Sequence, residues 1–159
     1  LLSLLTPMDA LLPPSSLLSA STQSPSPLTP SLPTLLLFSS SWCPDCKPFL
    51  ARLLTVLEDL HDASPSGKAV NVVYVSSDKD SAQCGEYVKA MPEYFHYVSF
   101  EDEEARSALK RRFRTCAGSE ADSVGVKDRL RGIPNLVVLG EGGEVKTEDA
   151  TKDVEGFRG

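Results

Sequence analysis

Runs of apolar residues alternate along the chain with stretches of mixed polarity, in the order that is typical of an α/β domain. The run at 35–38 (Leu-Leu-Leu-Phe) predicts a strand that is buried on both faces. The β-branched and aromatic residues at 70–75 predict a second buried strand, and residues 133–139 predict a third. Residues 97–100 predict a further short strand or extended segment.

Helical spacing of apolar residues follows the first predicted strand. Between residues 49 and 60, apolar positions three and four apart predict a helix with a wide apolar face. This helix should end near His61, before the turn-forming Ser-Pro-Ser-Gly at 64–67. We expect His61 to be a surface residue rather than a catalytic base. Two further helices are predicted at 81–90 and 103–113.

The third strand, at 133–139, is followed by Gly-Glu-Gly-Gly, which predicts a hairpin turn into residues 144–146. Strands that are joined through helices run parallel, whereas the two strands of a hairpin run antiparallel. The sequence therefore predicts an α/β fold with a central mixed β-sheet and helices on both of its faces.

Residues 1–34 differ in composition from the domain predicted at 35–159. They are rich in Leu, Ser and Pro, they contain no Lys or Arg, and Asp9 is their single charged residue. We expect this segment to be largely flexible, with Leu11, Leu12, Leu17 and Leu18 available to pack as a short strand or hairpin against the domain edge. The sequence predicts neither a secretory signal nor a transit peptide. We expect a cytoplasmic protein, with the nucleus or an organelle as alternatives.

The net charge of −6 and the isoelectric point near 4.9 argue against a general nucleic-acid-binding protein, because phosphate binding needs a basic face. The only dense basic cluster, at 110–114, follows an acidic cluster at 101–104. This order predicts a solvated helix with oppositely charged ends that match the helix dipole. No run of 18 apolar residues occurs, so no membrane-spanning segment is predicted.

Two of the four cysteines, Cys43 and Cys46, lie three residues apart, which indicates redox chemistry or metal binding rather than a disulfide scaffold. The reactive form of a thiol is the thiolate. Cys43 lies between a predicted strand and a predicted helix, where unpaired N–H groups favour negative charge. Cys46 follows one helical turn later, within disulfide reach. We predict that Cys43 attacks a substrate disulfide and that Cys46 resolves the mixed disulfide.

The two residues between the cysteines shape this site. Pro44 lacks an N–H group and suits the first turn of a helix, so it fixes the spacing of the two sulfur atoms. Asp45 favours capping of the helix N-terminus, but its negative charge should oppose formation of the Cys43 thiolate. We expect Asp45 to make the site less acidic and more selective than a neutral residue would.

A Cys-X-X-Cys pair can also be half of a zinc site, which then needs a second pair of ligands. The remaining cysteines and histidines show no paired spacing, so we predict no metal. Pro134 follows Gly-Ile at the start of a strand, a position where a cis peptide bond can occur. An ordinary proline at the entry to a strand is the alternative interpretation.

Several motifs together resemble the tryparedoxin and nucleoredoxin branch of the thioredoxin superfamily. These motifs are Phe-Ser-Ser-Ser-Trp-Cys-Pro-Asp-Cys-Lys-Pro-Phe at 38–49, Val-Tyr-Val-Ser-Ser-Asp-Lys-Asp at 73–80, Met-Pro at 91–92 and Gly-Ile-Pro-Asn-Leu-Val-Val-Leu at 132–139. The resemblance covers about residues 35–146. It implies a thioredoxin fold, a catalytic Cys43 and Cys46, and a cis-Pro134 that faces the disulfide. It also implies that the backbone of Ile133 pairs with the substrate and that Trp42 is an aromatic lid.

The chain departs from the pattern of this branch at four places. Asp45 and Lys47 stand where the branch usually has Pro and Arg. Residues 114–131 are longer than the expected link, and we interpret them as a surface loop inserted before the proline strand. The final helix of the fold is expected to be short or missing. Leu37 stands near the position of the buried acid that many thioredoxins keep beneath the active-site helix.

The leading functional hypothesis is a thiol–disulfide oxidoreductase that reduces protein disulfides, including those of peroxidases. The electron donor would be a low-molecular-weight dithiol or a flavoprotein reductase, and we expect a monomer with no cofactor beyond the Cys43–Cys46 disulfide. The alternatives are a redox-gated protein-binding module and an exported disulfide oxidase or isomerase, which the missing signal disfavours. We interpret Cys84 and Cys116 as structural residues rather than regulatory thiols.

Overall fold

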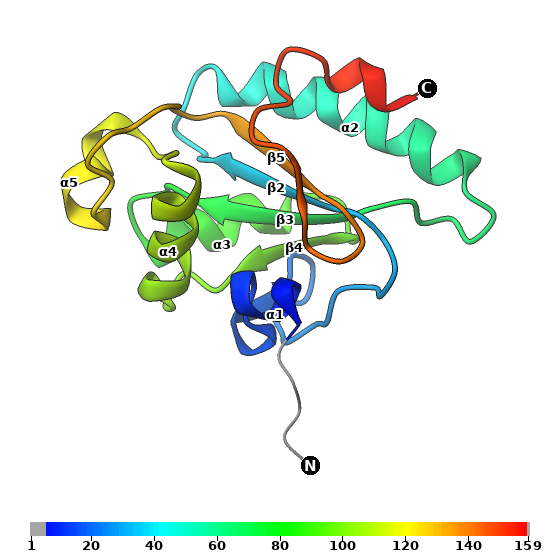
Figure 1. Ribbon diagram of the computed structural model, residues 1–159, viewed down its shortest axis with the longest axis horizontal. Helices are drawn as coiled ribbons and strands as arrows, with labels where there is room; N and C mark the ends of the chain where they lie inside the picture. The colour runs from blue at the N-terminus through cyan, green and yellow to red at the C-terminus, as the bar shows by residue number, and fades with distance from the viewer. Residues whose placement is uncertain (1–5, 159) are drawn as a thin grey trace.

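The two long apolar runs form the centre of a six-stranded sheet in the computed structural model, which describes residues 6–158 (Figure 1). The strands are ordered β1-β4-β3-β2-β5-β6. The three central strands, β2 (Thr34–Ser39), β3 (Asn71–Ser76) and β4 (Phe95–Val98), run parallel. The outer strands, β1 (Leu17–Ser19), β5 (Asn135–Leu139) and β6 (Val145–Thr147), pair antiparallel. The predicted mixed sheet is confirmed.

Helices cover both faces of this sheet, as predicted. The helices α2 (Cys46–Ala63) and α3 (Ser81–Lys89) and the 3₁₀ helix η3 (Val154–Arg158) pack on one face. The helices α1 (Pro7–Leu11) and α4 (Glu103–Phe113) pack on the other face. Figure 1 shows η3 lying along α2, where Arg52 forms a bidentate ion pair with Glu155. No helix within residues 6–158 is long and apolar enough to cross a membrane.

The uninterrupted apolar run of β2 follows from this layered arrangement. Successive side chains of a strand point to opposite faces of the sheet. Leu35 and Leu37 belong to the core beneath α2 and α3, whereas Leu36 and Phe38 belong to the core beneath α1 and α4. A strand that is buried on both faces favours apolar side chains at successive positions, and all four residues are at most 2% exposed.

The N-terminal segment packs onto the domain, with Leu17 and Leu18 in a short strand at the sheet edge as expected. β1 pairs with β4, and Leu12, Leu17 and Ala20 are buried. A 3₁₀ turn, η1 (Pro14–Ser16), places the Ser16 hydroxyl against the carboxylate of Asp102, the N-cap of α4. Burial of the leucines against the sheet outweighs the local preference of Ser and Pro for open conformations. Residues 1–5 of the segment lie outside the described residues.

Residues 114–131, which were predicted to be an inserted surface loop, lie mostly at the surface. They contain a 3₁₀ turn, η2 (Gly118–Glu120), and a short helix, α5 (Ala121–Val124). Thr115 and Cys116 are fully buried, and Thr115 forms a parallel bridge with Arg131. The segment closes on itself because its two ends pair through backbone hydrogen bonds.

Two polar side chains that were expected in solvent are buried instead. Lys110 in α4 is fully buried, and its Nζ atom donates hydrogen bonds to the Ser76 carbonyl at 2.8 Å and to the Glu120 carboxylate. His61 near the end of α2 is 7% exposed, and its Nδ1 atom accepts a hydrogen bond from the Ala69 N–H at 2.9 Å. Polar groups from β3 and η2 compensate the burial of Lys110, whereas His61 Nε2 has no partner among the described residues.

Candidate active site

The two cysteines lie where β2 leads into α2. Cys43 is in the connecting turn and Cys46 is the first residue of α2, with its N–H donating to the Cys43 carbonyl at 3.3 Å. Both are free thiols; Cys43 is 5% exposed and Cys46 is fully buried. Both residues are therefore buried, and Cys43 is the one of the two that keeps a small exposed surface.

Pro44 and Asp45 form the exposed part of the turn between the cysteines. Asp45 is the N-cap residue of α2, but its side chain accepts no capping hydrogen bond. This differs from the capping role that its residue type predicts. The Asp45 side chain is instead exposed to solvent in the turn between the two cysteines.

The segment that leads into β5, with Ile133 and Pro134, lies beside Cys43. The Ile133–Pro134 peptide bond is cis, as predicted, and the Cys43 thiol donates to the Ile133 carbonyl at 3.9 Å. Phe38 of β2 is directly opposite Asn135 of β5, so the residues after one strand and before the other meet at the same end of the sheet. The antiparallel pairing of β2 and β5 therefore assembles this part of the site.

Trp42 extends the surface around Cys43. Its side chain is 39% exposed, and its indole N–H donates to the Ser77 carbonyl at 2.9 Å. This hydrogen bond attaches the residue before Cys43 to the end of β3.

Asp78 is a site residue to which the sequence assigned no role. Its carboxylate, 7% exposed, accepts hydrogen bonds from the Ser41 N–H and hydroxyl, both at 2.7 Å. It also accepts from the Tyr74 hydroxyl at 2.6 Å and from the Ser76 hydroxyl at 2.7 Å. Asp78 thus connects β3 to the turn that carries Trp42 and Cys43. The Val-Tyr-Val-Ser-Ser-Asp motif contains three of the four residues of this network, and its position directly after a strand was the available signal.

Burial is the largest influence on the pKa of the Cys46 thiol. Desolvation and the neighbouring Cys43 together raise the pKa of Cys46 to about 12. The Ser39 hydroxyl and the Ser40 backbone N–H lower the pKa of the same thiol. The Cys46 thiol is therefore protonated at neutral pH in the dithiol form.

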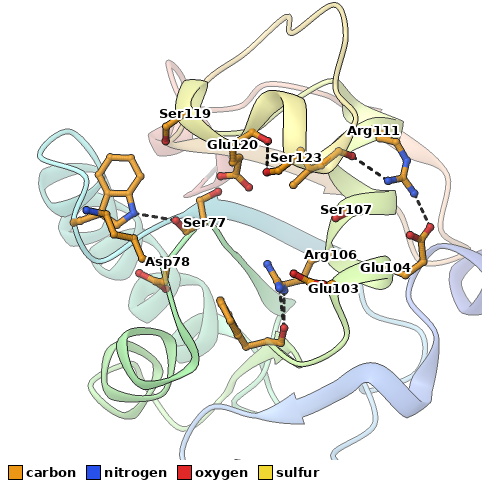
Figure 2. Close-up of a pocket in the computed structure, with 14 residues that line it drawn as sticks. Ser77, Asp78, Glu103, Glu104, Arg106, Ser107, Arg111, Ser119, Glu120 and Ser123 are labelled. Atoms are coloured by element: carbon orange, nitrogen blue, oxygen red, sulfur yellow. Dashed lines mark hydrogen bonds and ion pairs between the residues drawn. The ribbon is translucent and has the colours of Figure 1, made fainter.

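A polar groove of about 490 Å³ adjoins Trp42 (Figure 2). Figure 2 shows Ser77 and Asp78 on one side of the groove, Glu103 and Arg106 of α4 on another, and Glu120 above them. The elements η2 and α5 form one wall of this groove. The segment 114–131 therefore lies beside the active site.

The other two cysteines are buried in the protein core. Cys84 in α3 and Cys116 after α4 are fully buried, and desolvation raises the pKa of both thiols, that of Cys84 to about 11. Within residues 6–158, no group of three or more His, Cys, Asp or Glu side chains is arranged to hold a metal ion.

Comparison with known proteins agrees with this geometry. A family described as thioredoxin-like matches residues 32–145. The chain belongs to the tryparedoxin and nucleoredoxin branch of the thioredoxin superfamily. Nucleoredoxin from Xenopus laevis is 32% identical over 117 residues, which are 74% of this chain and 23% of that protein. Nucleoredoxin-like protein 1 from Mus musculus is 32% identical over 123 residues, which are 76% of this chain and 49% of that protein.

Solved tryparedoxins share the fold of this thioredoxin-like chain. Tryparedoxin II from C. fasciculata superimposes with a TM-score of 0.70 at 23% identity, covering 94% of this chain and 87% of its own. Another structure of tryparedoxin II is complexed with glutathionylspermidine. The chain spans about a quarter to a half of the length of the nucleoredoxin relatives, so it corresponds to one part of those larger proteins.

Proposed function

We propose that this thioredoxin-like chain reduces disulfide bonds in proteins. The Cys43 thiolate attacks one sulfur of the substrate, which forms a Cys43 mixed disulfide and releases the other substrate sulfur as a thiolate. The Cys46 thiolate then attacks the Cys43 sulfur and displaces the second substrate sulfur. Two electrons pass to the substrate and the Cys43–Cys46 disulfide remains, to be reduced by an external dithiol.

The observation that carries this proposal is the position of the Cys43 sulfur. It lies 3.9 Å from the Ile133 carbonyl beside cis-Pro134, at the start of α2, with the buried Cys46 one turn behind it. An extended substrate segment can pair with the Ile133 backbone and bring its disulfide to Cys43. The exposed face of Trp42 supplies the adjoining apolar contact.

Insulin reduction with dithiothreitol as donor tests the proposal. Replacement Cys43→Ser should abolish turnover, because no other residue can form the first mixed disulfide. The matched control Cys84→Ala removes a thiol that is fully buried in α3 and should retain turnover. Full activity of Cys43→Ser would contradict the proposal.

We infer a low-molecular-weight dithiol or a flavoprotein reductase as donor and protein disulfides, including those of peroxidases, as targets. The structure of tryparedoxin II with glutathionylspermidine supports a small thiol donor for this branch. Trapping with Cys46→Ser, which stops the cycle at the mixed disulfide, should recover the target covalently bound to Cys43. Recovery through another residue would contradict the assignment.

The groove beside Trp42 supports a second candidate, a binding module whose partner contact depends on the redox state of the two cysteines. In that case, Cys43→Ser should retain partner binding while insulin reduction is lost. Oxidation of the wild-type dithiol should change partner affinity.

A further inference from the structure

A buried arginine lines the groove beside Trp42. Arg106 of α4 is 7% exposed, and it forms no ion pair with any residue in the range 6–158. Its Nε and Nη2 atoms donate to the Phe100 carbonyl at 3.0 and 2.8 Å, and its Cζ atom lies 4.2 Å from the centroid of the Phe100 ring. Burial of a charge is costly unless an opposite charge accompanies it, so this cation is suited to an anion that binds in the groove.

The guanidinium group of Arg106 faces the groove. Figure 2 shows it extending from α4 toward the wall that Ser77 and Asp78 form. The two hydrogen bonds to Phe100 fix its plane and leave further N–H donors on Nη1 and Nη2, because a guanidinium group has more donors than one carbonyl can use. Two neighbouring N–H donors can bind both oxygens of a carboxylate. Since the group is already held in place, a ligand loses little entropy in ordering it.

A second donor of the groove also lacks a partner. Ser77 is 7% exposed, and its hydroxyl makes no hydrogen bond to any group of the described chain. Ser77 directly follows β3, and its carbonyl accepts the hydrogen bond from the Trp42 indole. A buried hydroxyl without a partner destabilises the fold, and an acceptor in the groove would remove that cost. Arg106 and Ser77 therefore offer donors to one ligand from two walls of the groove.

Four carboxylates also line the groove, but most of their charge is compensated. The exposed Glu103 is balanced by the exposed Lys79, which lines the groove as well. The other three have polar partners: Glu104 pairs with Arg111, Glu120 pairs with Lys110, and Asp78 accepts hydrogen bonds from Ser41, Tyr74 and Ser76. A buried charge is screened less by water than an exposed one. Arg106 is therefore the charge that a ligand in this groove would feel most strongly.

We propose that the groove beside Trp42 binds a carboxylate group of the protein substrate, with Arg106 as the cation that holds it and the Ser77 hydroxyl as a further donor. This inference rests on the proposed reductase function and names a substrate class for it, disulfides that lie next to an acidic residue. The chain has a net charge of −6, which repels acidic segments at long range. A preference for such segments therefore has to come from a local site.

The position of Trp42 indicates where the acidic residue lies in the substrate. Trp42 lines the groove and directly precedes Cys43, so a segment that reaches from Cys43 into the groove passes its side chain. An acidic residue about two to four positions from the reacting cysteine lies roughly 7–14 Å from it in an extended chain. Residues at these positions can extend beyond the indole ring while the disulfide stays at Cys43.

Matched peptides with a chromogenic leaving group test the inference. Each peptide carries one cysteine as a pyridyl disulfide, so attack by Cys43 on the peptide sulfur forms the Cys43–peptide disulfide and releases pyridinethione. One peptide of each pair has Glu about two to four residues from the cysteine, and the other has Gln at the same position. We expect wild-type protein to react about tenfold faster with a Glu peptide than with its Gln partner, the size of a hydrogen bond to a charged group.

Replacement Arg106→Met should remove the preference for Glu. Arg106→Lys should retain part of it, because the charge remains while the planar pair of donors is lost. Ser77→Ala should reduce the preference less than Arg106→Met does, since the cation stays in place. The ratio of the two rates compares two peptides on one protein sample, so it does not change when a variant leaves part of the protein unfolded.

Arg52→Met is the matched control. Arg52 is exposed in α2, where it pairs with Glu155, and it does not line the groove. This variant loses the same charge and should keep the wild-type preference. Equal rates for every Glu and Gln pair with wild-type protein, an unchanged preference in Arg106→Met, or an equal loss in Arg52→Met would overturn the inference. Failure of the proposed function differs, because wild-type protein would then release pyridinethione from neither kind of peptide faster than Cys43→Ser does.

Discussion

At the scale of single residues, Asp78 holds the active-site turn against β3 through four hydrogen bonds to its carboxylate. Its buried carboxylate carries a negative charge with no ion-pair partner among the described residues, and four neutral donors surround it. An anion can be buried in this way because each of its lone-pair directions is satisfied. The same bonds hold Ser41, two residues before Cys43, against the end of β3.

Replacement Asp78→Ala should therefore destabilise the fold and the site together. We expect the free energy of unfolding to fall by about 2–4 kcal/mol, because the buried Tyr74 hydroxyl and the Ser41 N–H lose their acceptor. Disulfide reductase activity should fall about tenfold, since loss of about 1.4 kcal/mol of transition-state stabilisation has that effect. Urea unfolding and insulin reduction measure the two effects. Ser41→Ala, which removes one of the four bonds, should show a smaller loss of both, and equal losses would contradict the network.

The exposed Asp45 carboxylate lies in the turn that carries Cys43, and we expect its charge to act on the Cys43 thiol through solvent. Replacement Asp45→Asn should make Cys43 more reactive at neutral pH, because the neighbouring negative charge no longer opposes the thiolate. We expect alkylation by iodoacetamide to accelerate about two- to threefold, the size of an exposed charge interaction, and the difference to shrink at high salt. Asp62→Asn, in the last turn of α2, is the control and should have no effect. An unchanged or slower reaction of Asp45→Asn would contradict this role.

At the scale of elements, one buried ion pair attaches the segment 114–131 to the sheet. Lys110 of α4 reaches the Ser76 carbonyl at the end of β3 and the Glu120 carboxylate of η2. Burial lowers the pKa of Lys110 and Glu120 opposes that shift. The Lys110 side chain thus joins a strand, a helix and the wall of the groove beside Trp42.

Removal of one partner of the Lys110–Glu120 pair should lower the free energy of unfolding more than removal of both partners. Glu120→Gln leaves the charge of Lys110 buried without its anion, and we expect the free energy of unfolding to fall by about 2–3 kcal/mol. The double variant Lys110→Met/Glu120→Gln should recover part of that loss, because no buried charge remains. Urea unfolding of the single and double variants checks this. A double variant that is less stable than Glu120→Gln would show that the pair stabilises the fold on balance.

At the scale of the whole molecule, two buried histidines connect stability to pH. His61 lies at the end of α2 near the turn to β3, and His96 in β4 contacts Ser26 and Pro27 of the N-terminal segment. Desolvation lowers the pKa of both side chains, and the charge of Lys68 lowers it further. The folded protein therefore favours the neutral form of each histidine.

Stability should decrease as the pH falls through about 6.5, the ordinary pKa of histidine. Below that value the unfolded chain binds protons that the folded chain excludes, so the free energy of unfolding falls, with a slope of at most about 1.4 kcal/mol per pH unit for each histidine. Urea unfolding at several pH values measures the slope. Replacement of both residues by Gln should flatten it, and a free energy of unfolding that increases on acidification would contradict the prediction.

Much of the fold and the centre of the site could be predicted because their signals are local. The apolar run Leu35–Phe38 indicates a doubly buried strand by itself, and the acid-to-base order of 103–113 indicates a helix. The spacing of Cys43 and Cys46 is likewise contained in four consecutive residues. The role of Asp78 could not be predicted, since it depends on Ser41 of the active-site turn meeting the carboxylate at the end of β3.

The sequence by itself determined the strands and helices from β2 to β6 apart from α5, the family, and the position of the Cys43–Cys46 pair. The tertiary structure alone decided which polar residues are buried. Lys110 and His61 lie in patterns typical of solvent-exposed helix ends, and the Ser- and Pro-rich segment carries the composition of a flexible chain. Their burial comes from contacts between residues far apart in the chain, such as Ser16 with Asp102, which outweigh local preference once the sheet supplies apolar surface and partners.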